Sequence, residues 1–139
     1  MRKLNSIALI FFILLTTLMF CNLSNAADKP STIKWVSYSN NIFKSAQSKH
    51  KQILIFGKAE WCHWCQQMKS DVFIDPQVIQ LINEKYIPVI VDIDEDATIA
   101  NQYNITSTPT FIILNANKTV ANTFYGYMPA SELMSSLRD

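Results

Sequence analysis

The sequence predicts a single α/β domain in which strand–helix units are followed by a β-hairpin and a terminal helix. Two continuous apolar runs, QILIFG at 52–57 and YIPVIVDI at 86–93, have the length and pattern of strands buried on both faces. Amphipathic segments separate them without an Asn-Gly hairpin turn, which favours a parallel crossover between them. A chain of 139 residues with no repeat and no long polar tract leaves room for one domain.

The helices of the first half are predicted from capping residues and apolar spacing. A first helix is expected to be capped within 39–41 and to end near the basic cluster 49–51. Four apolar residues fall close to helical spacing around it: Trp35, Ile42, Phe43 and Ala46. A second helix is expected from Cys62 through Lys69, and a third begins at Asp75-Pro76, where the acid caps and the proline occupies the first turn. Its apolar face is Val78, Ile79 and Ile82.

The second half continues the alternation and ends in a hairpin. Pro88 indicates that the strand at 86–93 begins at an edge or a bend. Acids open a short helix predicted over 94–103. Strands are predicted at 110–114 and 119–125, joined by a turn at 115–118, and Pro129 opens a last helix that runs to Leu137.

The N-terminal segment is typical of a secretory signal. Arg2 and Lys3 precede an apolar run at 7–20, and 24–26 supplies small residues for a signal peptidase. We expect cleavage after Ala26, which divides the chain into a signal peptide, 1–26, and one domain, 27–139. An uncleaved membrane anchor over 7–23 remains the alternative. An acylated Cys21 is disfavoured, because bulky side chains precede it at 18–20.

Charge and cysteine content narrow the function classes of the exported protein. Loss of 1–26 changes the balance from 12 basic and 11 acidic residues to 10 and 11, so no basic surface is implied and nucleic acid is not an expected partner. The expected compartment is the bacterial periplasm, or its membrane surface if the signal is retained. Cys62 and Cys65 are the cysteines that remain, and one short bridge is not the disulfide framework of a small stapled domain.

The Cys62-His63-Trp64-Cys65 motif can be tested against four kinds of chemistry. A structural disulfide closing a loop of about four residues would contribute roughly 1.9 kcal/mol, which is little. A haem tether needs histidine directly after the second cysteine, where this chain has Gln66. Zinc needs four ligands, and beyond the cysteines the chain offers at most His63 or His50. Dithiol redox chemistry is what remains, with no metal and no bound cofactor.

The two cysteines have different expected roles. If Cys62 caps the helix that follows the 52–57 strand, unpaired backbone N–H groups and the helix dipole stabilise its thiolate. Cys62 is therefore the predicted nucleophile. Cys65, one helical turn further on, would resolve the mixed disulfide by attacking the Cys62 sulfur.

An ordered set of motifs resembles the thioredoxin superfamily over nearly the whole of 27–139. The set is a buried strand, AEWCHWC at 59–65, VDIDED at 91–96, Ser107-Thr108-Pro109-Thr110 and Gly126. The segments at 33–47 and 71–83 are also similar to exported domains related to the C-terminal domain of the membrane thiol:disulfide interchange reductase. The resemblance implies the thioredoxin fold, a central mixed β-sheet flanked by helices on both faces. It also implies that Thr108-Pro109 is a cis-proline turn that faces the cysteines and that a substrate strand pairs with it.

The chain departs from the thioredoxin pattern at two places. Phe56 stands where thioredoxins carry a buried acid, so the proton acceptor for Cys65 is left open between water and Glu60. His63-Trp64 replaces Gly-Pro, and a protonated His63 would favour the Cys62 thiolate unless it is simply an exposed loop residue.

Aromatic residues divide between the expected binding site and the expected core. Trp61 and Trp64 are expected to form an apolar rim for a substrate peptide, with packing against the helix as the alternative for Trp61. Thr108, Pro109 and Gly126 complete the expected substrate site. Trp35, Phe43 and Tyr86 are assigned to the core.

These inferences predict an exported, monomeric thiol–disulfide oxidoreductase that exchanges electrons with protein cysteines and with a membrane or soluble redox partner. The direction of electron flow stays open: relatives with similar leads are mostly reductants, whereas His63 favours oxidant or isomerase behaviour. The alternative is a non-catalytic module that binds an extended peptide and carries a passive disulfide.

Overall fold

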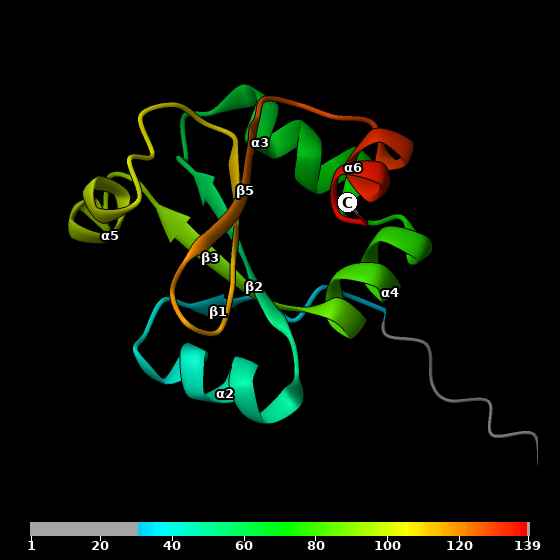
Figure 1. Cartoon of the computed structure of the whole chain (residues 1–139). Helices are drawn as coiled ribbons and strands as arrows, with labels where there is room; N and C mark the ends of the chain where they lie inside the picture. The colour runs from blue at the N-terminus through cyan, green and yellow to red at the C-terminus, as the bar shows by residue number, and fades with distance from the viewer. Residues whose placement is uncertain (1–30, 139) are drawn as a thin grey trace, which may run out of the picture.

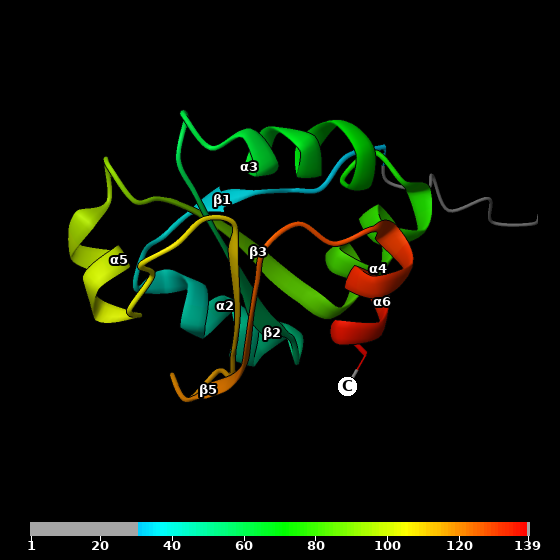
Figure 2. The ribbon, with the colours of Figure 1, turned by 90° about the horizontal axis from the view of Figure 1, so that it is seen from above.

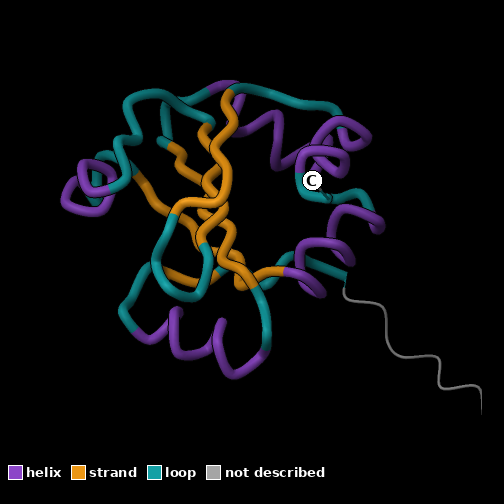
Figure 3. The backbone as a smooth tube through the Cα atoms, viewed as in Figure 1, coloured by secondary structure: helices purple, strands orange, loops and turns teal. Residues whose placement is uncertain are grey.

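The computed structural model describes residues 31–138, and these form one mixed five-stranded sheet with helices on both faces (Figures 1 and 3). The strand order is β1-β3-β2-β4-β5. The strands are β1 Val36–Ser37, β2 Gln52–Lys58, β3 Tyr86–Asp92, β4 Thr110–Leu114 and β5 Val120–Tyr125. The predicted fold class is therefore confirmed. The two-residue strand β1 was not predicted, because it is too short for an alternation pattern.

Strand pairing follows the predicted combination of a crossover and a hairpin. β3 pairs in parallel with β2 and with β1, while β4 pairs antiparallel with both β2 and β5. β1 pairs with β3 only at Val89 and Ile90, so the beginning of β3 around Pro88 is open on that side, as its proline indicated. Alternate side chains of β2 and β4 enter the cores on the two opposite faces of the sheet, which explains the continuous apolar character of these strands.

Helices cover the two faces of the sheet in separate groups. The helices are α2 Asn41–Lys49, α3 His63–Gln67, the π-helical segment η2 Met68–Val72, α4 Pro76–Lys85, α5 Ala97–Gln102 and α6 Ala130–Ser136. Figures 1 and 2 show α5 on one side of the strands and α4 with α6 on the other. The core residues agree: α2 and α5 pack on one face, and α3, η2, α4 and α6 on the opposite face.

Alternation along β2 assigns its side chains to these two cores. Ile53 and Ile55 contact the α2 face, whereas Leu54 and Phe56 contact the face that α3 covers. The Phe56 ring is completely buried, and its centroid lies 5.6 Å from Trp35, 5.0 Å from Phe73 and 5.2 Å from Phe111. This aromatic cluster forms the floor beneath α3.

Trp35 does not belong to the apolar face of α2 with which its spacing grouped it. It precedes β1 and packs against the α3 face, while Ile42, Phe43 and Ala46 belong to the opposite core. Its helical spacing with those residues was therefore coincidental, although its assignment to the core holds. The cap of α2 also differs: the Asn40 side chain makes no cap hydrogen bond, and the Ser39 carbonyl instead accepts from the Ile42 N–H at 3.1 Å.

The later helices begin close to the predicted positions. Asp75 accepts hydrogen bonds from the N–H groups of Gln77 and Val78 at 2.7 and 3.2 Å, with Pro76 in the first turn. α5 begins at Ala97, three residues later than expected, because the acids at 94–96 form the connection after β3 rather than a helical turn. α6 begins directly after Pro129.

Replacing Phe56 with alanine should lower the free energy of unfolding by about 3–5 kcal/mol, because the cavity would lie inside the aromatic cluster. Urea unfolding followed by far-UV circular dichroism measures the change. Val120→Ala is the control, since Val120 is 54% exposed on β5 and its loss should cost no more than about 0.5 kcal/mol. A loss below about 1 kcal/mol for Phe56→Ala would show that the cluster does not stabilise the fold.

Candidate redox site

The two cysteines lie where β2 is followed by α3. Cys62 is the N-cap of α3, with extended backbone angles of φ −78° and ψ 103°. The Cys65 N–H donates to Cys62 Sγ at 3.1 Å, and the two residues form a disulfide with their Cα atoms 5.3 Å apart. The sulfur of Cys62 thus occupies the position of a capping acceptor at a helix N-terminus, as the sequence predicted.

The two cysteines differ in burial, and the difference agrees with their predicted roles. Cys65 is completely buried, whereas Cys62 retains 4% of its surface and is the more accessible of the pair. A disulfide partner arriving from solvent therefore meets Cys62 first. The assignment of Cys62 as the attacking thiol stays a prediction, and the accessibility difference supports it.

Three side chains next to the cysteines are exposed. Trp61 is 69% exposed and its Nε1–H donates to the Asp94 carboxylate at 2.8 Å, so little of this ring packs against α3. Trp64 is 52% exposed and lies 5.5 Å from the His63 ring and 5.7 Å from the Tyr127 ring, centroid to centroid. Apolar surface is thus available beside Cys62, which is what a peptide-binding rim requires.

The Thr108-Pro109 turn lies at the same end of the sheet as the cysteines. Thr110 opens β4 and pairs with Gly57, the residue before the last of β2, so Pro109 sits beside the strand end that leads to Cys62. The Thr108–Pro109 peptide bond is cis. Gly126 donates its N–H to the Pro109 carbonyl at 2.8 Å and has φ +85°, a left-handed conformation that glycine adopts without strain.

A buried ion pair at the end of β2 that leads to Cys62 was not predicted from the sequence. Lys58 and Asp92 are direct partners in the β2–β3 register, and Lys58 Nζ donates to the Asp92 carboxylate at 2.6 Å. Both residues are buried, and Lys58 also bonds the exposed carboxylate of Glu60. The signal in the sequence was a lysine that ends one apolar strand and an aspartate at the matching position of the next.

Electrostatics keeps this pair charged. Burial raises the pKa of Asp92, but the hydrogen bond from Lys58 and those from backbone N–H groups outweigh burial and hold that pKa below its usual value. Burial likewise lowers the pKa of Lys58, and hydrogen bonds to Asp92 and Glu60 reverse the effect, so this pKa is raised. A lysine–aspartate salt bridge at this depth therefore persists at neutral pH.

Of the two proton acceptors expected for Cys65, water and Glu60, the structure disfavours Glu60. Phe56 fills the position of the family acid with a buried ring, so no carboxylate reaches Cys65 from there. Glu60 has a 74% exposed side chain that bonds Lys58, which holds its pKa below the usual value. An exposed carboxylate of lowered pKa is a poor acceptor for a thiol proton. Of the two expected acceptors, water and Glu60, water therefore remains.

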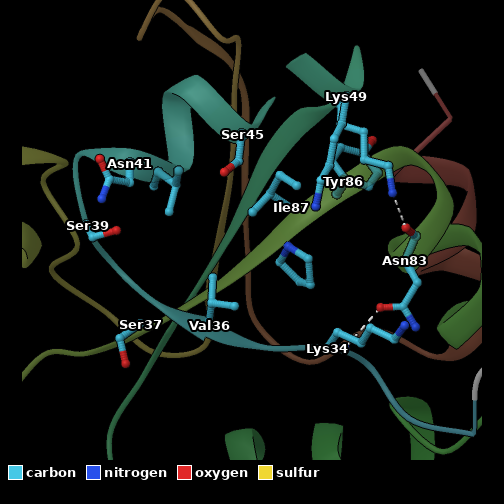
Figure 4. Close-up of a pocket in the computed structure, with 13 residues that line it drawn as sticks. Lys34, Val36, Ser37, Ser39, Asn41, Ser45, Lys49, Asn83, Tyr86 and Ile87 are labelled. Carbon is cyan, nitrogen blue, oxygen red and sulfur yellow. Dashed lines mark hydrogen bonds between the residues drawn. The ribbon is translucent and has the colours of Figure 1, made fainter. Parts of the chain in front are cut away.

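The structure also contains a cavity that is unrelated to the cysteines (Figure 4). It measures about 420 Å³ and lies between β1, α2 and the beginning of β3, with Lys34, Lys49 and Ile87 among its lining residues. The Asn83 backbone carbonyl accepts from Lys51 Nζ at 2.5 Å at its margin. None of the predicted site residues lines this cavity.

Within residues 31–138 a metal-binding cluster and a membrane-spanning helix are both absent. In that part of the chain, no group of three or more histidine, cysteine, aspartate or glutamate side chains is placed to hold a metal ion. Over the same residues, no helix has the length and apolar character needed to cross a membrane. The predicted signal peptide, 1–26, lies outside the described residues.

One protein-family model matches most of the chain. Residues 19–118 match the family model Thioredox_DsbH, described as "Protein of unknown function, DUF255". The chain belongs to this family. Thioredox_DsbH membership and the fold place it in the thioredoxin superfamily, and Cys62 and Cys65 form its Cys-x-x-Cys disulfide.

Curated relatives match over part of their length. The chain is 33% identical to thioredoxin Y, chloroplastic, of Oryza sativa subsp. japonica over 91 residues, which are 66% of this chain and 52% of the relative. It is 27% identical to spermatogenesis-associated protein 20 of Rattus norvegicus over 71 residues, which are 51% of this chain and 9% of the relative. The chain thus spans about half of the thioredoxin and a small part of the second protein.

Solved structures confirm the fold and the expected resemblance. A thioredoxin from Thermus thermophilus superimposes with a TM-score of 0.68 at 27% identity, covering 77% of this chain and 85% of the other. DsbH oxidoreductase gives 0.66 at 20% identity, covering 84% and 93%. The C-terminal domain of Neisseria meningitidis DsbD in its oxidised form gives 0.61 at 14% identity, covering 74% and 97%.

The Lys58–Asp92 pair should make stability depend on pH in acid. Because the folded pKa of Asp92 is lowered, its contribution is complete above the unfolded pKa of about 3.9 and is lost as pH falls through the folded value. Asp92→Asn should therefore destabilise the protein by roughly 3 kcal/mol at pH 7, and this difference should shrink toward pH 2–3. Urea unfolding at several pH values measures both.

Glu84→Gln is the matched control for this prediction, because Glu84 is an exposed acid on α4 and carries no buried ion pair. Its effect should stay within about 0.5 kcal/mol at every pH. A loss of stability in Asp92→Asn that is the same at pH 7 and pH 3 would contradict the assigned ionisation.

Proposed function

We propose that this protein exchanges electrons with cysteines of other proteins through a mixed disulfide on Cys62. The observation that supports this most directly is the position of Cys62 Sγ as the N-cap acceptor of α3, 3.1 Å from the Cys65 N–H. The same N–H groups and helix dipole would stabilise a thiolate after reduction. A disulfide that serves stability alone gains nothing from that placement.

In the reductive direction the chemistry has two steps. The Cys62 thiolate attacks one sulfur of the substrate disulfide, forming a Cys62–substrate disulfide and releasing the other substrate sulfur as a thiolate. Cys65 then gives its proton to water and attacks Cys62 Sγ. The Cys62–Cys65 bond forms, the second substrate thiolate leaves, and two electrons have passed to the substrate. Oxidation of a substrate dithiol is the same sequence reversed.

The substrate we propose is an extended protein segment that lies across the Cys62 end of the sheet. Trp61 and Trp64 would supply apolar contact on one side, and the backbone of Thr108 and Pro109 would supply hydrogen-bonding groups on the other. Thr108 Oγ1 is buried without a hydrogen-bond partner among residues 31–138, so a substrate amide could satisfy it. Gly126 would keep space free beside Pro109, since apart from its own chain neighbours no atom lies within 4 Å of the position its Cβ would take.

We further propose that the protein acts after export, as a monomer that needs no bound cofactor. The support for export is the signal-like segment 1–26, which lies outside the described residues. Its electrons would come from, or go to, a membrane or soluble redox partner in the bacterial periplasm. N-terminal sequencing of the exported protein should begin at Ala27, and recovery of Met1 would make it a membrane-anchored protein instead.

The function is tested by insulin reduction and by trapping. Reduced protein should catalyse insulin reduction with dithiothreitol as the electron source, and Cys62→Ser should abolish catalysis. Cys65→Ser should retain the first step and accumulate mixed disulfides through Cys62, visible on non-reducing gels. Alkylation of the reduced protein at mildly acidic pH should label Cys62 before Cys65.

Lys51→Met serves as the control, because Lys51 directly precedes β2 at the end opposite the cysteines. This variant should reduce insulin at the parental rate. A wild-type protein that does not accelerate insulin reduction, with a Cys65→Ser variant that traps nothing, would favour a peptide-binding module with a passive disulfide.

His63→Ala should lower the reduction potential, because loss of a protonatable imidazole beside Cys62 removes stabilisation of the thiolate in the reduced form. A twofold change in the redox equilibrium corresponds to about 9 mV for this two-electron couple. Glutathione titration measures the potential. Gln67→Ala, on the same helix and away from Cys62, is the control, and an unchanged potential in His63→Ala would leave His63 as an exposed helix residue.

A further inference from the structure

The Lys58–Asp92 pair lies on the cysteine side of the sheet. Phe56 faces the core that contains Cys62 and Cys65, and Lys58 follows it by two residues on the same strand, so its side chain leaves the same face. Asp92 is opposite Lys58 in the parallel register, and the two side chains meet on that face. The pair therefore lies two residues closer to Cys62 along β2 than the Phe56 ring.

Backbone hydrogen bonds connect the pair to the start of the cysteine loop. The Lys58 carbonyl accepts from the Ile93 N–H at 2.9 Å, directly after Asp92. The next residue, Ala59, uses its carbonyl to accept from the Cys62 N–H at 3.2 Å. Ala59 itself is buried in the same core as both cysteines. Between the ion pair and Cys62 there is thus one tight turn, in which Ala59 is buried while Glu60 and Trp61 are exposed.

We propose that Lys58 and Asp92 are positioning residues for disulfide exchange, whose buried charges set how readily Cys62 and Cys65 ionise. The proposal rests on the proposed function and extends it to the control of the thiols. It assigns no proton-accepting step to Asp92, because a carboxylate held ionised by a lysine is too weak a base for a thiol. The pair acts through its field instead.

The field of the pair has two components of opposite sign. The Lys58 ammonium favours a thiolate nearby, and the Asp92 carboxylate disfavours it. Buried charges are screened less than exposed ones, so each acts over the short distance to the loop more strongly than a surface charge would. Intact, the two components largely cancel. Removing Asp92 leaves Lys58 paired only with the exposed Glu60 carboxylate, and removing Lys58 leaves the Asp92 carboxylate without its ammonium partner. The two removals should therefore shift the cysteines in opposite directions.

Other charged groups around the pair are few and are placed differently. Glu60, on the loop itself, bonds Lys58 from the solvent side, and Lys69 on η2 acts on Glu60 through space. Asp94 follows β3, gives its N–H to Asp92 and uses its carboxylate to bond Trp61. His63 is exposed on α3. None of these charges is removed in the variants below, although Lys58→Met also takes away the partner of Glu60.

The test is the pH profile of alkylation of the reduced protein, with Cys62 and Cys65 followed separately by mass spectrometry. Asp92→Asn should lower the pH at which Cys62 reacts, and Lys58→Met should raise it. We expect about a threefold change in thiolate fraction in each direction, equal to about half a pKa unit. The double variant Lys58→Met/Asp92→Asn, which removes both charges, should return close to the parental profile.

Controls separate a field effect from structural damage. Lys51→Met and Glu84→Gln remove one charge of each sign far from the cysteines, and neither should move the profile. Damage to the fold would shift both single variants in the same direction or leave the double variant the most altered. If Lys58→Met does not fold, the alkylation profiles of Asp92→Asn and of the double variant can still be compared. The double variant carries neither buried charge.

The result is independent of whether insulin is a substrate, because alkylation needs no catalysis. Opposite shifts with no insulin reduction would support the pair's role and reject the proposed function. Insulin reduction by the parental protein, with equal profiles for all variants, would support the function and overturn the role assigned to Lys58 and Asp92.

Discussion

The pairing of β2 with strands on both sides is the constraint on which the rest of the structure depends. β2 is held in parallel register by β3 and in antiparallel register by β4, so its last residues are fixed relative to both neighbours. Its end defines where the chain turns into α3, and therefore where Cys62 caps that helix. Pro109, which precedes β4, is brought to the same place by the Thr110–Gly57 pairing. A helix cap, a proline turn and a redox pair thus lie at one end of the sheet, where β2 ends.

Gly57 shows how closely this edge is packed. A Cβ at Gly57 would lie 2.8 Å from Ile105 Cγ2, so the strand packs against the loop after α5 with no room for a side chain. On the other face of the sheet, Phe56 occupies the space under α3 with an aromatic cluster. The first charged side chain in this region is Lys58, at the end of the strand, where its ammonium donates to the Asp92 carboxylate. Apolar packing of Phe56 takes the place of the buried acid of thioredoxins, and the buried charges of Lys58 and Asp92 lie closer to the cysteine loop along the chain.

Comparison of sequence and structure shows which inferences local patterns support. The continuous apolar runs gave β2 and β3, and the Asp75-Pro76 start of α4 was predictable because the cap involves neighbouring residues. The α5 start was placed too early, since acids suit a helix N-terminus and a connecting turn equally well. β1 and the position of Trp35 depend on contacts with Phe56 and Phe73, which are distant in sequence and leave no periodic signal.

By itself the sequence determined the fold class, the position of the cysteines at a helix start and the residues that could surround them, because these follow from local periodicity, capping and an ordered set of motifs. The tertiary structure decided which of these residues meet. It exposes Trp61 and Trp64, bonds Gly126 to Pro109 and encloses Phe56 in a ring cluster. Above all it pairs Lys58 with Asp92, 34 residues apart. A salt bridge between two strands depends on their register, and register is settled only when the whole sheet is assembled.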